Sequence, residues 1–224
     1  MKDFIVHSIP GSPFGRAVLA MLEEKGARYR LAALTPQDMR GARHLSLHPF
    51  GRLPILEHGD FRVYETQAIL RYLDRVLPMP LTPPDAKAAA VVDQLMNIND
   101  WYLFQGAASV IGFQRVVGPR LLGLPTDEAA VAAALPKAQM AFDEVARILA
   151  GHTYLGGDTL TLADLLIAPQ MDFLAQLPEW AVLTQRHPNL GAWLARMNMR
   201  ACMQATTWER VAAMASGSAL QKAS

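Results

Sequence analysis

One stretch, residues 51–66, constrains the fold most, because it combines a proline, a tight turn and a helix start. Pro54 stands directly before an apolar pair, and since proline cannot donate to a sheet ladder, it belongs at the start of a strand or on a sheet edge. Gly59–Asp60 is a dipeptide of the kind that joins hairpin strands. The stretch therefore predicts two antiparallel strands, over residues 55–58 and 61–64.

A helix is predicted directly after this hairpin, because apolar residues recur three and four positions apart, at Ala68, Ile69, Tyr72, Leu73 and Val76. Its start, at Glu65–Thr66, would offer free N–H groups to a ligand carboxylate. If the Leu53–Pro54 bond is cis, the main-chain N–H and C=O of Leu53 would also turn outward toward an extended peptide. Cis is the minority state, at about 5–6% of such bonds in folded proteins. The residues alone leave two interpretations open, a peptide-binding edge and an ordinary strand with a capped helix.

The residues before the hairpin predict a strand, a helix and a second strand. The strands cover residues 4–6 and 29–33, and the helix runs from Pro13 to Lys25. A strand–helix–strand connection gives a parallel pair. Residues 35–47 are expected to form a loop with one weak helix. We therefore predict an α/β domain of the thioredoxin-like arrangement over residues 1–77.

A proline-rich linker, residues 78–86, is predicted to separate this domain from an all-helical one over residues 87–224. Thr161 and Asp164 form a capping box, which is a folding element rather than a site. A loose tail is expected from Ser216 on. The predicted helices of the second domain cover residues 85–115, 125–149, 162–175, 188–199 and 203–214, with a short turn at 180–185.

Composition narrows the possible partners. The chain has 224 residues, a formal net charge of +1 and no basic run, so neither nucleic acid nor an anionic membrane is expected as the main partner. Its single cysteine, Cys202, excludes an intramolecular disulfide and a structural cysteine–zinc site. A reducing compartment and a cytoplasmic location follow as expectations, and no metal is expected.

Several motifs together resemble the cytosolic glutathione transferases. Residues 48–56, HPFGRLPIL, resemble Asn-Pro-Phe-Gly-Gln-x-Pro-x-Leu, and residues 65–73, ETQAILRYL, resemble Glu-Ser-x-Ala-Ile-x-x-Tyr-Leu. The departures are His48 for Asn, Arg52 for Gln and Thr66 for Ser. In the second half, the Thr161–Asp164 box and a Pro-x-Leu-x-x-Trp-x-x-Arg-Met run match the family's helical domain. The resemblance is to bacterial, serine-type, theta/phi-like members and implies an α/β thioredoxin-like domain plus an all-α helical bundle.

The resemblance implies a thiol activator in the first loop. Such enzymes lower the pKa of the glutathione thiol. The pKa of a free thiol is about 8.5. Ser12 stands before Pro13, a residue favoured at the first helical position, so its hydroxyl could face a sulfur at the helix N-terminus. The segment from residue 12 matches the Ser-Pro run of serine-type classes, which makes Ser12 the expected catalytic residue. Ser8 is the rival hydroxyl, and a purely capping role is the alternative for Ser12.

The same match assigns the rest of the tripeptide site. Leu53 and Pro54 would hold the cysteinyl main chain, Glu65 and Thr66 the γ-glutamyl end, and Arg40 or Arg52 the glycine carboxylate. An electrophile pocket is expected between the domains, lined by Ile9, Phe14, Trp101, Phe104 and Gln105, although aromatic residues at this density could equally form the core of a helix bundle. Phe50 matches an aromatic key that enters the partner subunit in some relatives, so a homodimer is expected.

The resemblance leaves three functions open. The first is conjugation of the glutathione thiolate to small hydrophobic electrophiles, with glutathione as co-substrate. The second is a glutathione-dependent isomerase or dehalogenase on the same fold. The third is a non-catalytic glutathione-binding or regulatory protein. The combination of Ser12, Leu53–Pro54 and Glu65–Thr66 favours the first.

Overall fold

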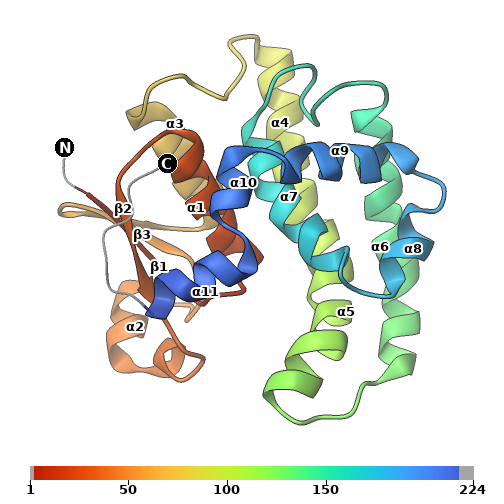
Figure 1. Cartoon of the computed structure of the whole chain (residues 1–224), viewed down its shortest axis with the longest axis horizontal. Coiled ribbons are helices and arrows are strands. Elements are labelled where there is room, and N and C mark those ends of the chain that lie inside the picture. Colours follow the sequence, from red (N-terminus) through yellow and green to blue (C-terminus); the bar gives the residue numbers. More distant parts are fainter. Residues whose placement is uncertain (1–2, 217–224) are drawn as a thin grey trace. The chain divides into compact units, whose positions relative to one another are not determined.

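The computed structural model describes residues 3–216, which form two compact units (Figure 1). The first unit comprises residues up to Leu81 together with those from Asn198 on, and the second comprises Thr82–Met197. This division differs from the predicted domains because the segment after residue 197 packs with the first unit. The tail expected beyond Ser216 lies outside the described residues.

The first unit is built on a four-stranded sheet in the order β2-β1-β3-β4. Strand β1 (Phe4–Ser8) runs parallel to β2 (Tyr29–Ala33), whereas β3 (Ile55–His58) is antiparallel both to β1 and to β4 (Phe61–Tyr64). The hairpin therefore forms where the proline and the Gly–Asp turn predicted it, and the arrangement is thioredoxin-like.

Helices α1 (Pro13–Glu24) and α3 (Thr66–Val76) contact each other and pack on the sheet. The core between these helices and the strands consists of fully buried apolar side chains, among them Phe4, Val6, Val18, Leu19, Leu22, Ile69 and Leu73. The expected weak helix is present as two short pieces, η1 (Asp38–Arg40) and α2 (Ala42–Leu47). Burial of one face of each long helix therefore holds the layers together.

A buried ion pair fastens the chain where it leaves the first unit. The Lys25 ammonium lies 3.0 Å from Asp74 Oδ1, and it also donates to the carbonyls of Pro78 and Met79. The same carboxylate oxygen of Asp74 accepts the N–H of Leu81 at 2.7 Å. Because both charges are buried and hydrogen-bonded, removing either partner would leave an uncompensated charge.

The second unit is all-helical, as predicted, but its first long helix differs from the prediction. The α-helical geometry of α4 (Ala86–Ile98) gives way to π-helical turns in η2 (Asn99–Ala108), and the helix continues to Leu121 rather than ending near residue 115. The N–H of Ser109 donates to the carbonyl of Phe104, five residues back, at 2.7 Å. Hydrogen bonds of this kind, to the residue five positions back, are rare, and the predicted pattern assumed ordinary α-helical spacing. The following elements are α5 (Val110–Gly112), η3 (Phe113–Leu121), α6 (Glu128–Leu149), α7 (Leu162–Leu174), α8 (Glu179–Thr184) and α9 (Pro188–Asn198).

The predicted last helix, residues 203–214, is wrong in its extent, because two helices occupy this part of the chain. They are α10 (Ala201–Ala205) and α11 (Trp208–Ser216). Thr206 leaves helical geometry between them, and its hydroxyl donates to the Cys202 carbonyl at 2.8 Å. A threonine that bonds back to the preceding turn competes with helix continuation.

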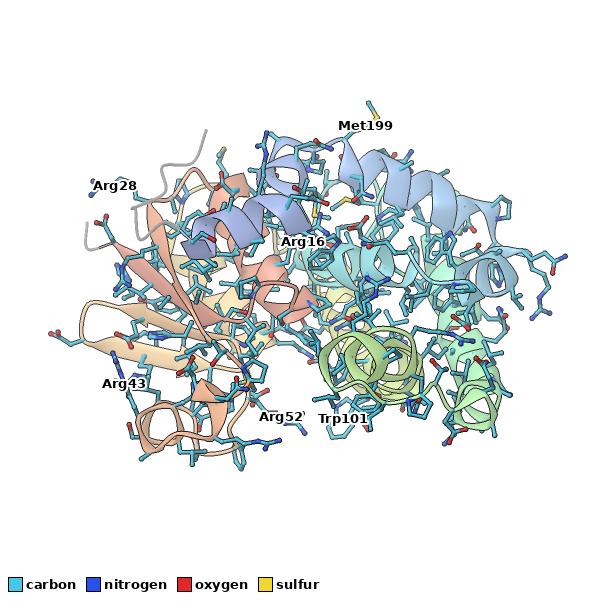
Figure 2. The ribbon with its side chains drawn as sticks, turned by 60° about the horizontal axis from the view of Figure 1, so that its bottom comes forward. Arg16, Arg28, Arg43, Arg52, Trp101 and Met199 are labelled. Atoms are coloured by element: carbon cyan, nitrogen blue, oxygen red, sulfur yellow. The ribbon has the colours of Figure 1, made fainter. Side chains whose placement is uncertain are left out.

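This C-terminal segment is attached to α1 through a buried arginine, Arg16, labelled in Figure 2. Its Nη2 donates to the Met203 carbonyl at 3.4 Å, and its guanidinium carbon lies 4.4 Å from the ring centre of Trp208. Arg200 adds an ion pair with Glu24 at the other end of α1. The segment is therefore an integral part of the first unit. Among residues 3–216, no helix is both long and apolar enough to cross a bilayer.

Candidate glutathione site

The strand register brings three of the predicted site segments to one end of the sheet. His7 of β1 lies opposite Ile55 of β3, and Ile55 lies opposite Tyr64 of β4. The loop after β1, the Leu53–Pro54 pair before β3 and the residues after β4 therefore emerge side by side. The carboxyl end of β2 lies at the same end, because β1 and β2 are parallel.

Ser12 is the N-cap of α1, directly before the predicted helix start at Pro13. It is extended, with φ −78° and ψ 119°, and Pro13 follows it in the first helical position. Its Oγ accepts the N–H of Gly15 at 3.2 Å, so its own proton stays available for donation. Because the helix N-terminus carries positive partial charge, this position suits an anion. Ile9 and Phe14, two of the expected pocket residues, are half-buried in the same loop and helix start.

Ser8, the rival hydroxyl, is buried at 2% exposure and packs against α1. A Cβ built on Gly15 would lie only 1.9 Å from Ser8 Oγ. Only a glycine can therefore occupy position 15 while Ser8 keeps this place. The two serines thus differ in environment, since Ser8 faces the helix and Ser12 remains half-exposed.

The segment between α2 and β3 contains the one cis peptide bond among residues 3–216, Leu53–Pro54. This is the state on which the predicted outward turn of Leu53 depended. The main chain of Arg52, just before this pair, is fixed by a side chain of α2, because Nε2 of His44 lies 2.8 Å from the Arg52 carbonyl oxygen. His44 is 3% exposed, whereas the Arg52 side chain extends outward from this loop in Figure 2.

Glu65 precedes α3 with φ 70° and ψ 117°. A glutamate in this left-handed region is unusual and marks a place where the surroundings impose a conformation. The carboxylate is exposed, and Thr66, the first helical residue, is buried at 6% exposure. The helix start thus presents an acidic group beside the positive end of the helix dipole.

The ring of His48 packs against Tyr64, one residue before Glu65, with ring centres 4.4 Å apart. His48 is 1% exposed. Burial lowers the pKa of its imidazole, although the Glu65 carboxylate acts in the opposite direction. His48 and His44 are both buried and lie near the segments that the resemblance assigns to glutathione. Neither was predicted as a site residue, and their spacing of four residues, which is typical of one helix face, is the one signal in the sequence that could have indicated them.

The two expected cationic candidates, Arg40 and Arg52, are both exposed. Arg40 ends η1 and Arg52 stands in the loop before Pro54. Among residues 3–216, neither has an ion-pair partner. Both charges are therefore available to an anionic ligand.

A pocket of about 670 Å³ lies within the second unit, between η2 and α6. Trp101 and Gln105 line it, whereas Phe104 does not. Trp101, labelled in Figure 2, is 64% exposed, so it is not part of a helix-bundle core. The remaining lining residues, which the sequence analysis did not single out, are Gln94, Ile98, Tyr102, Gly106, Lys137, Met140, Ala141 and Glu144.

Comparison with known proteins agrees with this geometry. Residues 2–75 match the family model "Glutathione S-transferase, N-terminal domain", and residues 104–201 match "Glutathione S-transferase, C-terminal domain". The chain is 33% identical over 195 residues to a glutathione S-transferase of Hyoscyamus muticus, covering 85% of this chain and 91% of the relative.

Solved structures agree with the sequence matches. The fold superposes on glutathione transferase F7 from Populus trichocarpa with a TM-score of 0.82 and 25% identity, covering 95% of this chain and 99% of that one. Glutathione S-transferase I from maize, solved in complex with an atrazine glutathione conjugate, gives a TM-score of 0.81 and 27% identity over 97% of this chain and 100% of that one. On the sequence motifs, the fold and these matches, the chain belongs to the glutathione S-transferase family.

Proposed function

We propose that this protein conjugates the glutathione thiolate to small hydrophobic electrophiles, with Ser12 as the residue that activates the thiol. The observation that carries the proposal is the state of the Ser12 hydroxyl. Its oxygen is occupied by the Gly15 N–H, and among the described residues no acceptor takes its proton. A hydroxyl donor at a helix N-terminus stabilises a thiolate over a thiol, and each unit of pKa corresponds to about 1.4 kcal/mol.

The rest of the tripeptide would lie along the end of the sheet. The main chain of Leu53, next to Pro54, would pair with the cysteinyl residue, and the γ-glutamyl end would face Glu65 and Thr66. An exposed carboxylate suits the γ-glutamyl ammonium, while the N–H groups of the helix start suit its carboxylate. Arg40 and Arg52 are the candidates for the glycine carboxylate, since both are exposed cations on the segment that leads to Pro54.

Ile9 and Phe14 support an electrophile site next to Ser12, because the N–H of Ser12 donates to the Ile9 carbonyl at 3.1 Å and Phe14 starts the same helix. Trp101, Phe104 and Gln105 remain proposed pocket residues. Two of them, Trp101 and Gln105, line the pocket of the second unit.

A serine-type, theta/phi-like subclass is part of this proposal. It is supported by Ser12 at the helix start and by the likeness to the poplar and maize enzymes. These enzymes and the Hyoscyamus relative are from plants, so the expected bacterial character is not confirmed. A cytoplasmic location also belongs to the proposal, and the buried, unpaired state of Cys202 fits it.

We further propose a homodimer in which Phe50 of one copy enters the second-unit pocket of the other. Phe50 is 71% exposed on its loop, and it stands where the family resemblance implies an aromatic key that enters the partner subunit. The pocket offers apolar contacts from Ile98, Met140 and Ala141. A phenyl ring therefore suits it as occupant.

The test of the catalytic role is Ser12→Ala, assayed with glutathione and an aromatic halide. Turnover should fall about 10- to 1000-fold, because one preorganised donor contributes a few kcal/mol in the transition state. The lost cap should cost only about 1 kcal/mol of stability, which thermal unfolding would report. Ser8→Ala is the matched control, and its turnover should stay near that of the wild type.

The same assay separates the alternatives. Unchanged turnover in Ser12→Ala would remove this residue from the mechanism. A product that lacks the glutathionyl group would favour the isomerase or dehalogenase. Retention on immobilised glutathione without turnover of any electrophile would favour the non-catalytic binding protein.

A further inference from the structure

The hydrogen bond between His44 and the main chain before Pro54 has a consequence for ligand binding. We propose that His44 is a positioning residue, which sets the plane of the Arg52–Leu53 peptide so that the N–H of Leu53 faces the tripeptide. The inference rests on the proposed function, because it needs glutathione to lie along Leu53. It adds a specific residue and a ligand class, γ-glutamyl tripeptides recognised through their main chain.

The chemistry of the contact identifies the tautomer of His44. Its Nε2 lies 2.8 Å from the Arg52 carbonyl oxygen, and a carbonyl can only accept, so Nε2 carries the proton. The other ring nitrogen, Nδ1, is buried and has no hydrogen-bond partner among residues 3–216. A proton on Nδ1 would have no acceptor there, so the ring serves as a single donor, from Nε2 toward Arg52.

The geometry of the peptide unit transmits this contact to Leu53. Leu53–Pro54 is the one cis bond among residues 3–216, so the Arg52–Leu53 bond is trans. In a planar trans peptide the C=O of the first residue and the N–H of the second point in opposite directions. An imidazole that holds the Arg52 oxygen from the buried side therefore turns the Leu53 N–H to the opposite side.

The position of His44 in the fold makes this contact firm. His44 is the only buried residue of the six-residue helix α2. Its ring stacks on that of His48, with centres 6.2 Å apart, and His48 in turn packs on Tyr64 at 4.4 Å. The row of rings thus connects the segment before Pro54 with the end of β4. A donor held in this way lowers the ordering cost of binding.

The position of the donor can be tested with two variants. His44→Phe keeps a ring but removes the donor, and His44→Gln keeps an N–H that can reach the carbonyl. Calorimetry would measure the Kd of glutathione and of its thiol-free analogue γ-glutamyl-aminobutyryl-glycine. His44→Phe should raise both Kd values by the same factor, about 5- to 10-fold, which is what one hydrogen bond is typically worth. His44→Gln should restore both to within about twofold.

Kinetics distinguish positioning from a general loss of structure. His44→Phe should raise the KM for glutathione while kcat at saturating glutathione changes less than about twofold, because the thiol activator is untouched. Tyr72→Phe is the matched control, since it removes another side-chain hydrogen bond of the first unit, the one between Tyr72 Oη and His58 Nδ1 at 2.8 Å. Its KM for glutathione should equal that of the wild type.

Several outcomes would overturn the inference. These are an unchanged Kd in His44→Phe, a His44→Gln variant as weak as His44→Phe, or an equal loss of affinity in Tyr72→Phe. If His44→Phe does not fold, His44→Asn, whose amide is too short to reach the carbonyl, takes its place with the same expectations. A wild-type chain that bound neither ligand would overturn the proposed function itself, and this inference with it.

Discussion

Two buried imidazoles in the first unit, those of His7 and His48, are expected to make the stability of the fold depend on pH. Burial lowers the pKa of His7, although the Glu57 carboxylate 2.9 Å away opposes this. Burial also lowers the pKa of His48. Neither ring therefore binds a proton in the folded chain at the pH where a free histidine does.

The sign of the pH effect follows from this difference. An unfolded chain binds these protons near a pKa of about 6.5, whereas the folded chain binds them only at lower pH. Below about pH 6.5 the unfolded state therefore holds more protons, and the free energy of unfolding should fall as the solution is acidified. Urea unfolding between about pH 7.5 and pH 5 would measure the slope. The His48→Phe variant should show a shallower slope, and a slope equal to that of the wild type would contradict the assignment.

At the scale of single residues, local sequence rules predicted where several of the proposed site residues lie in the fold. Ser12 could be predicted because Pro13 marks a helix start, and Glu65–Thr66 because a hairpin ends just before them. His44 could not, because its partner is the main-chain oxygen of Arg52, eight residues away in a segment without periodicity. A main-chain acceptor leaves no trace in the residue types.

Among the elements, the start of α7 is the most firmly fixed by polar contacts. Asp164 is fully buried and accepts four hydrogen bonds, from the N–H and hydroxyl of Thr161, the N–H of Leu155 and the indole of Trp193, all within 2.9 Å. It thus completes the predicted capping box and also reaches α9. Because the capping partner and the indole share one carboxylate, the box connects two helices.

Asp164→Ala should therefore destabilise the fold severely. It would leave four buried donors without an acceptor, and we expect a loss of about 3–5 kcal/mol in the free energy of unfolding. Chemical denaturation would measure it. Asp158→Ala is the control, because Asp158 is exposed and accepts one weaker bond, from the Thr153 N–H at 3.3 Å, and its loss should stay below about 0.5 kcal/mol. Similar losses in the two variants would show that the four hydrogen bonds of Asp164 contribute no more to stability than the one bond of Asp158.

Elements with signals at both ends were predicted well, and elements with an internal irregularity were not. The hairpin has a proline, a Gly–Asp turn and alternation, and α7 has its capping box. The π-helical turns from Asn99 and the break at Thr206 have no such signal. Both depend on which main-chain carbonyl a given group bonds to, and composition and spacing do not encode that choice.

At the scale of the whole molecule, the proposed dimer interface can be tested directly by substitution. Phe50→Ala should raise the dimer dissociation constant about 30-fold or more, because a buried aromatic anchor typically contributes 2 kcal/mol or more to an interface. Met140→Glu, which puts a charge at the wall of the proposed receiving pocket, should act in the same direction. Analytical ultracentrifugation over a range of concentrations would measure both.

Met199→Ala is the control for this experiment. Met199 is 83% exposed, projects outward in Figure 2 and does not line the pocket. Its dimer should therefore be as tight as that of the wild type. A Phe50→Ala dimer of unchanged strength would rule out this ring as the anchor of the interface.

The attachment of the C-terminal segment to α1 has a consequence for how the chain can be divided. Arg16 bonds to the Met203 carbonyl and stacks on Trp208, so the first unit combines two stretches of the chain that lie far apart in the sequence. Cutting the coding sequence at the proline-rich linker would separate partners of one folding unit. During synthesis, the first unit could be completed only after Met203 and Trp208 had left the ribosome.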